Sequence, residues 1–413
     1  MTRALVVIDG EHYPDVVRDA LAELPHEVVG VWLAGGEEKL RDGAADYGVP
    51  LHRDLDEALA ACEPELVLDL SDEPVLGPRE RFLAASRVLA AGVPYAGADF
   101  RFDPPVLEPF PLPSLGIVGT GKRVGKTAVS GHAARLLARD REVIVVAMGR
   151  GGPPEPEVME WPPSAADLLA LSRSGRHAAS DYLEDAALAG IVTIGCRRAG
   201  GGLAGATAFS NVAAGAEEAL ARSPDLVVFE GSGAALPPIR TSRRVLVAPA
   251  GSDVTGYLNA YRLLTSDLLV LTMAERPADT AAIRALRPDL PIVEAVLRPR
   301  PVEPVAGLRV AFFSTAPARA HALLAAHLRD AYGAASVAVS GNLARRGELQ
   351  ADLERAEADA WLVELKAAAI DVVAEAALER GVPLVLVDNE VVSPELDAEL
   401  LALAQAAREE VAV

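Results

Sequence analysis

One segment of the chain carries glycines, a lysine and a threonine at a spacing that can bind phosphate. Residues Gly116–Ala128 read GIVGTGKRVGKTA, so a short apolar run leads into glycines, then Gly125-Lys126-Thr127, then a helical stretch. Glycines allow backbone amides to turn inward around an anion, and the N-terminus of the following helix also favours negative charge. This pattern indicates a phosphate-binding loop, in which Lys126 contacts the β- and γ-phosphates and the Thr127 hydroxyl holds Mg²⁺.

The loop is one residue longer than the most common phosphate-binding spacing. In G-x-x-x-x-G-K-T the first glycine would stand at position 120, but this chain has Thr120 there and its glycine at Gly119. The longer loop resembles that of dethiobiotin synthetase, which reads G-T-D-T-x-V-G-K-T. The ParA/MinD type of ATPase is the disfavoured alternative, because its signature lysine would fall at Gly121, and Lys122 is one place off.

The loop residues divide into expected nucleotide contacts and expected catalytic cations. Lys126 serves both purposes, because its ammonium group would neutralise the phosphoryl group during transfer. Lys122 and Arg123 would screen the charge of a phosphorylated substrate beside the nucleotide. The expected nucleotide-binding residues are Gly119, Thr120, Gly121, Val124, Gly125, Lys126, Thr127 and Ala128.

A second motif supplies a carboxylate for the same site. Residues Asp225–Pro238 read DLVVFEGSGAALPP, a strand pattern that ends in Glu230-Gly231. A carboxylate at the end of a buried strand, facing the phosphate loop, is a common partner of Mg²⁺. Dethiobiotin synthetase has a similar segment, E-G-A-G-G-x-x-x-P. We therefore expect Thr127 and Glu230 to hold the metal; a solvated carboxylate at the strand end is the alternative interpretation.

A group of cations points to a second, strongly anionic ligand. Three segments, Gly149–Pro153, Arg176–Ala186 and Cys196–Gly205, combine arginine with glycine or histidine at predicted loop positions. In a doubly wound sheet the carboxyl ends of the strands converge on one crevice, and arginine suits bidentate phosphate contacts. Each of these side chains has an ordinary surface cation as its alternative interpretation. The expected substrate-binding residues are Arg150, Arg176, His177, Arg197 and Arg198.

Lysine is rare in this chain, so the position of each lysine carries information. Only four of the 39 basic side chains are lysines, and Lys122 and Lys126 both lie in the phosphate loop. Lys366 follows a predicted strand, where it is either a ligand contact or a surface charge. Lys39, in the run GEEKLRD, fits an ordinary surface position.

Two further polar segments follow predicted strands, and each has two interpretations. Asp9–Pro14 reads DGEHYP and Leu70–Pro74 reads LSDEP. Either segment could bind a ligand, or its polar side chains could simply cap the turn before a helix.

The elements that position these residues follow an α/β pattern. Apolar runs such as Ala4–Asp9, Ser114–Thr120 and Asp225–Gly231 are continuous, which is typical of parallel strands covered on both faces. Proline-rich stretches at 101–113 and 297–307 are expected to be linkers outside any sheet or helix.

The two linkers divide the chain into three expected domains, at residues 1–110, 111–300 and 301–413. The central domain is expected to have a P-loop NTPase-type, mostly parallel sheet with helices on both faces. The N- and C-terminal domains are expected to be smaller, Rossmann-like α/β units.

Composition excludes several classes of protein. The 413 residues carry a formal net charge of −20, which argues against a general nucleic-acid binder. Two cysteines, Cys62 and Cys196, cannot build a disulfide framework, and they fit a reducing compartment. The N-terminus shows no signal-peptide pattern, and no apolar run approaches the roughly 20 residues of a membrane span. We expect a cytoplasmic homodimer without nucleic-acid or membrane partners.

Several segments taken together resemble the cyclic 2,3-diphosphoglycerate synthetase family. The resemblance runs along most of the chain, from VVIDGEHYP to VDNE. It implies an ATP- and Mg²⁺-dependent ligase that closes 2,3-diphosphoglycerate into a cyclic product and releases ADP and phosphate. The segments that carry it are VGTGKRVGKTAVSGH, MGRGGP, GRHAASDYLEDA, TIGCRRAGGGLAG, VVFEGSGAALPP, SDLLVLTMAE and VELKAAAIDVV.

The residues and the resemblance agree on a reaction class. The γ-phosphoryl group of ATP could activate one substrate phosphate, after which the other phosphate attacks it and displaces inorganic phosphate. The protein would mainly supply positioning and charge neutralisation. Two alternatives remain: a kinase that makes 2,3-diphosphoglycerate from 2-phosphoglycerate, and a nucleotide switch of the ParA/MinD kind.

Overall fold

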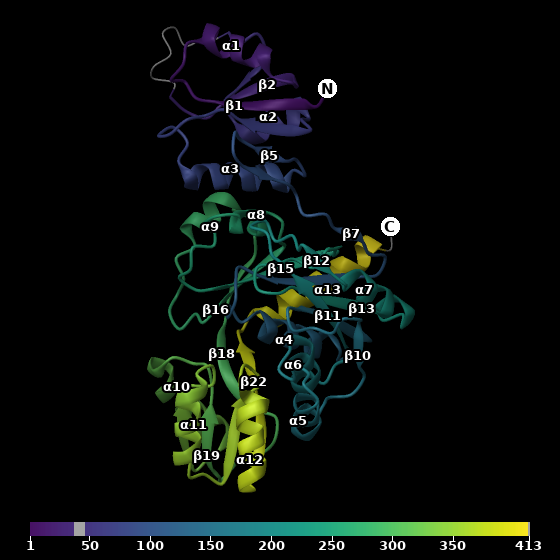
Figure 1. Ribbon diagram of the computed structural model, residues 1–413, viewed down its shortest axis with the longest axis vertical. Helices are drawn as coiled ribbons and strands as arrows, with labels where there is room; N and C mark the ends of the chain where they lie inside the picture. Colours follow the sequence, from purple (N-terminus) through teal and green to yellow (C-terminus); the bar gives the residue numbers. More distant parts are fainter. Residues whose placement is uncertain (37–45, 412–413) are drawn as a thin grey trace.

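Three α/β units follow one another along the long axis of the molecule (Figure 1). The computed structural model describes residues 1–36 and 46–411, so Lys39 lies outside the described residues. The N-terminal unit lies at one end, the central unit carries the phosphate loop, and the C-terminal unit lies at the other end. The expected fold class, α/β with mostly parallel sheets, is confirmed.

The N-terminal unit is a small doubly wound sheet. Its strand order is β3-β2-β1-β4-β5-β6, and β1, β2, β3, β4 and β5 pair in parallel. Chain order reverses between β1 and β4, so the carboxyl ends of these two strands lie side by side at the switch point. The elements are β1 (Arg3–Ile8), α1 (Pro14–Glu23), β2 (Glu27–Leu33), β3 (Leu51–His52), α2 (Leu55–Cys62), β4 (Leu66–Asp69), α3 (Pro78–Ala90), β5 (Tyr95–Ala96) and β6 (Arg101–Phe102).

The strands of the central unit form a nine-stranded sheet. Its main path is β10-β11-β9-β13-β8-β15-β16-β17, with β12 paired to β11. The strands are β8 (Ser114–Gly119), β9 (Val143–Gly149), β10 (Glu157–Met159), β11 (Thr193–Ala199), β12 (Phe209–Ser210), β13 (Leu226–Glu230), β15 (Arg243–Pro249), β16 (Leu268–Thr272) and β17 (Ile292–Glu294).

Helices cover both faces of this central sheet, as the continuous apolar strands predict. Val145 and Val228 pack in one core with the helix that follows the phosphate loop. Val146 and Val227 point to the other face and pack with α7. The helices are α4 (Lys126–Leu137), α5 (Ala165–Arg173), α6 (Asp181–Ala189), α7 (Val212–Ala221), α8 (Asn259–Leu264) and α9 (Ala281–Leu286).

The C-terminal unit is built on a five-stranded sheet in the order β18-β22-β21-β19-β20. The strands β19, β20, β21 and β22 are parallel, and β22 runs up toward the central unit in Figure 1. The elements are β18 (Val296–Pro301), β19 (Arg309–Phe313), α10 (Ala318–Tyr332), β20 (Ser336–Ser340), α11 (Arg346–Arg355), β21 (Ala360–Glu364), the π-helix η2 (Ala369–Ala374), α12 (Glu375–Arg380), β22 (Leu384–Val392) and α13 (Leu396–Val411).

The proline-rich segments are not purely linkers, so that expectation was wrong in part. Residues Val296–Pro301 form β18, in which Pro299 and Pro301 pair antiparallel with β22. β18 lies at the edge of its sheet, where a missing backbone N–H can face away from the neighbouring strand. Glu108–Pro109, in the first segment, forms the short strand β7, which pairs with β14 (Ile239–Arg240).

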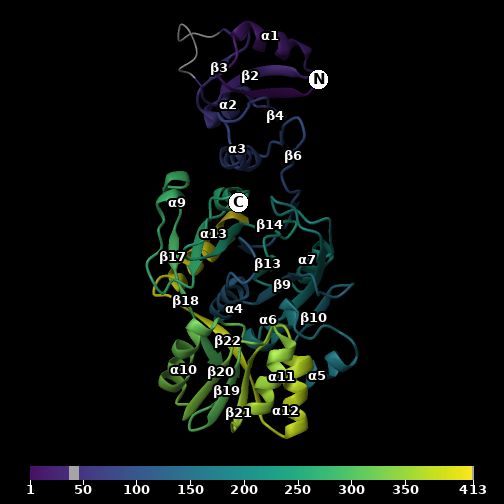
Figure 2. The same cartoon turned by 60° about the vertical axis from the view of Figure 1, so that its left-hand side comes forward.

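The last helix returns from the C-terminal unit to the central unit. α13 packs against α4, β8 and β15, so residues 301–413 do not all stay with the C-terminal sheet. Figures 1 and 2 both show this helix crossing the central unit, away from the C-terminal sheet. The helix of the phosphate loop is therefore covered by the end of the chain.

A half-buried ionic cluster also joins the C-terminal unit to α4. Asp388 in β22 is 5 % exposed and forms ion pairs with Arg135 of α4 and Arg300 of β18, each at 2.9 Å. His132 of α4 contacts Asp397 of α13 at 2.7 Å. None of the helices in residues 1–36 and 46–411 is long and apolar enough to cross a membrane.

Replacing Asp388 by asparagine is expected to destabilise this junction by about 1–3 kcal/mol, because two partly buried arginines lose their shared carboxylate. Urea unfolding measures the change. Asp359→Asn is the matched control, since Asp359 forms an exposed pair with Arg309 and its loss should matter little. Equal unfolding midpoints for both variants would contradict the proposed importance of the cluster.

Candidate active site

The phosphate loop connects β8 to α4 and is anchored by the next two strands of the sheet, β15 and β16. The Thr120 amide donates to the Val247 carbonyl of β15 at 3.1 Å. The Thr272 hydroxyl, at the end of β16, donates to the Val124 carbonyl at 2.7 Å. These bonds hold both halves of the loop against the carboxyl ends of the strands, so the loop amides are positioned without a ligand.

The backbone of the loop has the conformations that a phosphate cradle needs. Arg123 and Gly125 have positive φ values of 60° and 83°, and alternating backbone handedness turns successive amides to one side. A Cβ on Gly125 would lie 3.1 Å from the Cγ2 atom of Thr272. Among the described side chains, none caps the N-terminus of α4, so the first amides of that helix are available to an anion.

A buried ion pair joins the loop to β13. The Lys126 ammonium group donates to Glu230 Oε1, and the Thr127 hydroxyl donates to the same oxygen at 2.8 Å. Lys126 is 7 % exposed and Glu230 is fully buried. Burial disfavours the charged form of each group, but the opposite charge of its partner outweighs this effect. The pKa of Lys126 is therefore raised and that of Glu230 is lowered. Both groups are therefore charged at neutral pH.

The residues beside this pair suit a magnesium ion. Glu230 Oε2 is buried and has no hydrogen-bond partner within the described chain. Hydroxyl and carboxylate oxygens are hard donors, which Mg²⁺ prefers. In residues 1–36 and 46–411, no three His, Cys, Asp or Glu side chains are grouped as a complete metal site. A magnesium ion here would therefore complete its shell with water and nucleotide phosphates, as it usually does.

Three carboxylates on α6 are part of the same site, although they were not predicted from the sequence. Asp181, Glu184 and Asp185 are spaced three and four residues apart, so they lie on the helix face that packs toward α4. Glu184 and Asp185 are 6 % and 2 % exposed, whereas Asp181 is partly exposed. The signal was present in the segment ASDYLEDAA, where acids occupy positions that an ordinary helix would fill with apolar residues.

Burial and mutual repulsion keep these carboxyl groups from all ionising together. Burial raises the pKa of Asp185 well above its usual value, and the neighbouring Glu230 raises it further. Burial also raises the pKa of Asp181, while Lys126 opposes the shift. Carboxyl groups with raised pKa values therefore lie next to the phosphate loop.

The predicted cluster of five cations is divided between two places. Arg197 and Arg198 lie within β11, not in the loop where we expected them, because the strand continues to Ala199. Adjacent residues of a strand point to opposite faces. Arg197 Nε donates to the Gly152 carbonyl at 2.7 Å, whereas Arg198 Nη2 donates to the Ser232 carbonyl at 2.9 Å.

Arg198 belongs to the side of the crevice that adjoins the phosphate loop. Both Lys122 and Arg198 lie near Gly233, three residues beyond Glu230: a Cβ built there would be 3.5 Å from Lys122 Cγ and 3.8 Å from Arg198 Nη2. Burial lowers the pKa of Arg198, and the nearby charge of Arg150 lowers it further. Lys122, Arg150 and Arg198 therefore gather positive charge beside the expected γ-phosphate position.

The other three predicted residues line a separate cavity of about 350 Å³. Arg176, His177 and Arg197 contribute to its wall together with the glycine- and proline-rich turn after β9. Arg176 is already paired with Glu157 of β10, so it is less available to a ligand than we expected. Tyr182 and Leu183 of α6 also line the cavity, which places it next to the helix that carries the carboxylates.

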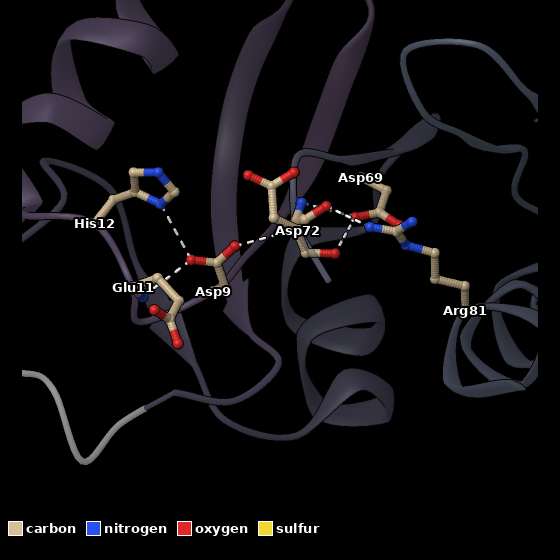
Figure 3. Close-up of polar contacts among 7 residues, drawn as sticks. Asp9, Glu11, His12, Asp69, Asp72 and Arg81 are labelled. Atoms are coloured by element: carbon tan, nitrogen blue, oxygen red, sulfur yellow. Dashed lines mark hydrogen bonds and ion pairs between the residues drawn. The ribbon is translucent and has the colours of Figure 1, made fainter. Parts of the chain in front are cut away.

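The polar loops of the N-terminal unit use their carboxylates internally (Figure 3). Asp9 accepts hydrogen bonds from the Glu11 and Asp72 amides at 3.0 and 2.9 Å. Asp69 accepts one from the Tyr95 hydroxyl at 2.6 Å, and Arg81 lies 3.2 Å from the same oxygen. These bonds tie the loops after β1 and β4 together, which favours the structural interpretation of both segments over ligand binding.

Comparison with known proteins covers all three units. Family models match in three segments: the P-loop domain of cyclic 2,3-diphosphoglycerate synthetase over residues 114–292, its C-terminal domain over 301–390 and its N-terminal domain over 3–103. The chain belongs to the cyclic 2,3-diphosphoglycerate synthetase family.

Full-length relatives carry the same family name. The cyclic 2,3-diphosphoglycerate synthetase of Rubrobacter xylanophilus is 51% identical, with 98% of each chain covered. That of Thermococcus gammatolerans is 42% identical, covering 94% of this chain and 93% of the relative. That of Methanothermus fervidus is 40% identical, covering 94% of this chain and 92% of the relative. The family's P-loop domain implies that this chain binds a nucleotide.

Stability should depend on pH through Glu184. Burial raises the pKa of this carboxyl to about 7, although Lys366 opposes the shift and Asp181, Glu230 and Asp388 add to it. The folded protein therefore keeps a proton that the unfolded chain has already lost, and its contribution to stability disappears as pH rises through 7. Glu184→Gln should show a smaller fall in thermal unfolding midpoint between pH 5 and 8 than the wild type.

Glu354→Gln is the control for this experiment, because Glu354 is an exposed residue of α11. Its unfolding midpoint should follow the wild-type pH dependence. Identical slopes for the wild type and Glu184→Gln would show that Glu184 holds no extra proton in the folded state.

Proposed function

We propose that this chain joins the two phosphate groups of 2,3-diphosphoglycerate into a cyclic anhydride, using ATP and Mg²⁺. The observation that carries the proposal is the phosphate loop with its buried Lys126–Glu230 pair beside a group of cations. Full-length relatives named for this activity support it.

The reaction balances as two phosphoryl-group steps. One substrate phosphate attacks the γ-phosphorus of ATP, so the β–γ bridging bond breaks and ADP leaves. The second substrate phosphate then attacks the phosphorus of the first substrate phosphate, the one that now carries the phosphoryl group from ATP. The new anhydride bond closes the ring, and the phosphoryl group that came from ATP leaves as inorganic phosphate.

Lys126 is proposed to exchange partners when the nucleotide binds. In this structure its ammonium group is held by Glu230; on binding it would move to the β- and γ-phosphate oxygens. Glu230 and the Thr127 hydroxyl would then hold Mg²⁺, which supplies positive charge to the phosphate oxygens. The amides of Gly119, Gly121 and neighbouring loop residues, with the start of α4, would surround the phosphates.

The cations beside the loop are proposed to hold the substrate. Joining two phosphate groups brings like charges together, so fixed positive groups must lie where that charge concentrates. Lys122, Arg150 and Arg198 gather at this side of the crevice, and Arg123 lies in the same loop. The cavity lined by Arg176, His177 and Arg197 adjoins them and would receive the remainder of the substrate.

We also propose that the protein acts in the cytoplasm as a homodimer. Its two free cysteines, Cys62 and Cys196, are both buried, which suits a reducing compartment. Sedimentation equilibrium of the purified chain would test the dimer: a mass equal to one chain at all concentrations would contradict it.

The activity can be tested directly by ³¹P NMR. Wild-type protein with ATP, Mg²⁺ and 2,3-diphosphoglycerate should give resonances of a cyclic pyrophosphate, with one ADP and one phosphate released per ring. Lys126→Ala should lose turnover by about 10³-fold or more, because the transferring phosphoryl group loses its fixed positive charge. Formation of 2,3-diphosphoglycerate from 2-phosphoglycerate, with no ring, would favour the kinase alternative instead.

Arg198→Ala should affect the substrate more than the nucleotide. We expect the KM for 2,3-diphosphoglycerate to rise about tenfold or more, since a charged hydrogen bond to phosphate is lost, while the KM for ATP changes by less than about twofold. Arg309→Ala removes one exposed arginine of the C-terminal unit and serves as the charge-matched control. Equal increases in both KM values would argue against a substrate contact.

A further inference from the structure

Of the three lysines in residues 1–36 and 46–411, Lys366 is the one that the proposed reaction has not used, and the fold brings it next to the carboxylates of α6. It follows β21, whose carboxyl end faces the central unit, as the parallel strand β22 does in Figures 1 and 2. Its ammonium nitrogen lies 3.5 Å from Glu184 Oε1 of α6. A cation from the C-terminal unit therefore meets the carboxylates of the central unit.

The backbone around Lys366 is held in a defined turn. Glu364, at the end of β21, accepts hydrogen bonds from the Ser314 hydroxyl at 2.9 Å and the Thr315 amide at 3.1 Å. Ala367 has a φ of 48°, a left-handed conformation that costs energy for a residue with a side chain. The π-helix η2 begins two residues later, and such irregular turns are frequent at functional sites.

The ammonium group of Lys366 has unused hydrogen-bonding capacity. It carries three donors, and its single ion pair among the described residues is the 3.5 Å contact with Glu184. A charge-assisted hydrogen bond is normally about 2.7–2.9 Å long. The side chain is also 38% exposed, although Glu184 beneath it is buried. Lys366 is thus held beside the carboxylates of α6 without being fully engaged there.

Lys366 and Lys126, which belong to different units, both favour the charged form of one acidic group. Asp181 interacts electrostatically with both lysines, and burial raises its pKa while they oppose the shift. Glu184 and Lys366 stabilise each other's charge, so the pKa of Lys366 is raised, but burial and the neighbouring acids raise the pKa of Glu184 to about 7. An anionic ligand with fully ionised phosphate groups would compete effectively against this carboxyl group.

We propose that Lys366 binds a phosphate group of the anionic substrate from the C-terminal side of the crevice, exchanging Glu184 for that phosphate. The inference rests on the proposed function and deepens it: cations would then approach the two substrate phosphates from both units. Ring closure needs charge neutralised on both phosphates at once, and Lys366 would add a cation from a second unit to those of the central unit.

Steady-state kinetics of Lys366→Ala test this role. The KM for 2,3-diphosphoglycerate should rise about tenfold or more, while the KM for ATP and the thermal unfolding midpoint should stay close to wild type. Lys366→Arg should recover part of the affinity, because it restores the charge. No change in the substrate KM, or equal increases for substrate and ATP, would overturn the proposal.

Two control variants separate substrate binding from a purely structural role. Arg346→Ala removes an exposed cation of the same unit, which pairs with Asp371, and should leave both KM values unchanged. Glu184→Gln removes the carboxylate that competes with the substrate for Lys366 and should therefore lower the substrate KM. If Lys366 acted only by holding the units together through Glu184, Glu184→Gln would raise the substrate KM as much as Lys366→Ala.

Calorimetric titration distinguishes failure of this inference from failure of the proposed function. 2,3-Diphosphoglycerate is titrated into protein saturated with Mg²⁺ and a non-hydrolysable ATP analogue, for wild type and Lys366→Ala. Weaker binding to the variant supports the Lys366 contact even if no cyclic product forms with ATP. Equal binding to both proteins overturns it even if the wild type makes the cyclic product. Absence of binding to the wild type would overturn both proposals.

Discussion

The buried pair between Lys126 and Glu230 is the interaction on which the rest of the site depends. It joins the first residue of α4 to the last residue of β13, with almost no exposure to solvent. Removing either partner would leave an uncompensated buried charge, which costs several kcal/mol in proteins, on the order of 3–5. The pair therefore holds the phosphate loop in place, and a nucleotide must replace it with contacts of equal strength.

Around this pair there are more carboxyl groups than is usual for a site that binds anions. Asp181, Glu184 and Asp185 lie on one face of α6, next to Glu230. Their burial keeps part of this set protonated, so the site is less negative than its composition. Lys126 from the central unit and Lys366 from the C-terminal unit both interact with these carboxylates.

The N-terminal unit is organised differently, although it has the same kind of switch point. Asp9 and Asp69 are buried at the ends of adjacent parallel strands, but Asp9 accepts a hydrogen bond from the Asp72 amide and Asp69 accepts one from the Tyr95 hydroxyl of β5, both within the same unit. The unit joins the central domain through α3, which packs on α8, and through an ion pair of Arg79 with Asp253 at 2.8 Å.

The proline-rich strand and the arginine pair show where local patterns fail. Prolines predicted a linker at 297–307, but an edge strand tolerates them, and edge position depends on strand order in the folded sheet. Arg197 and Arg198 are neighbours in the sequence, yet β11 continues through both and sends them to opposite faces. The local sequence therefore shows that two arginines are present, but it does not show the direction in which each side chain points.

The sequence by itself determined the fold class and the phosphate loop, because both arise from contiguous patterns: continuous apolar strands, and glycines directly before a lysine and a helix. The place of Glu230 beside the loop could also be predicted, since a strand that ends in a carboxylate is a local signal. Only the tertiary structure decided that the acids of α6 face the loop and that Lys366 meets Glu184. Those contacts depend on how separate units pack, and helix packing places side chains that are distant in the chain within a few ångströms of each other.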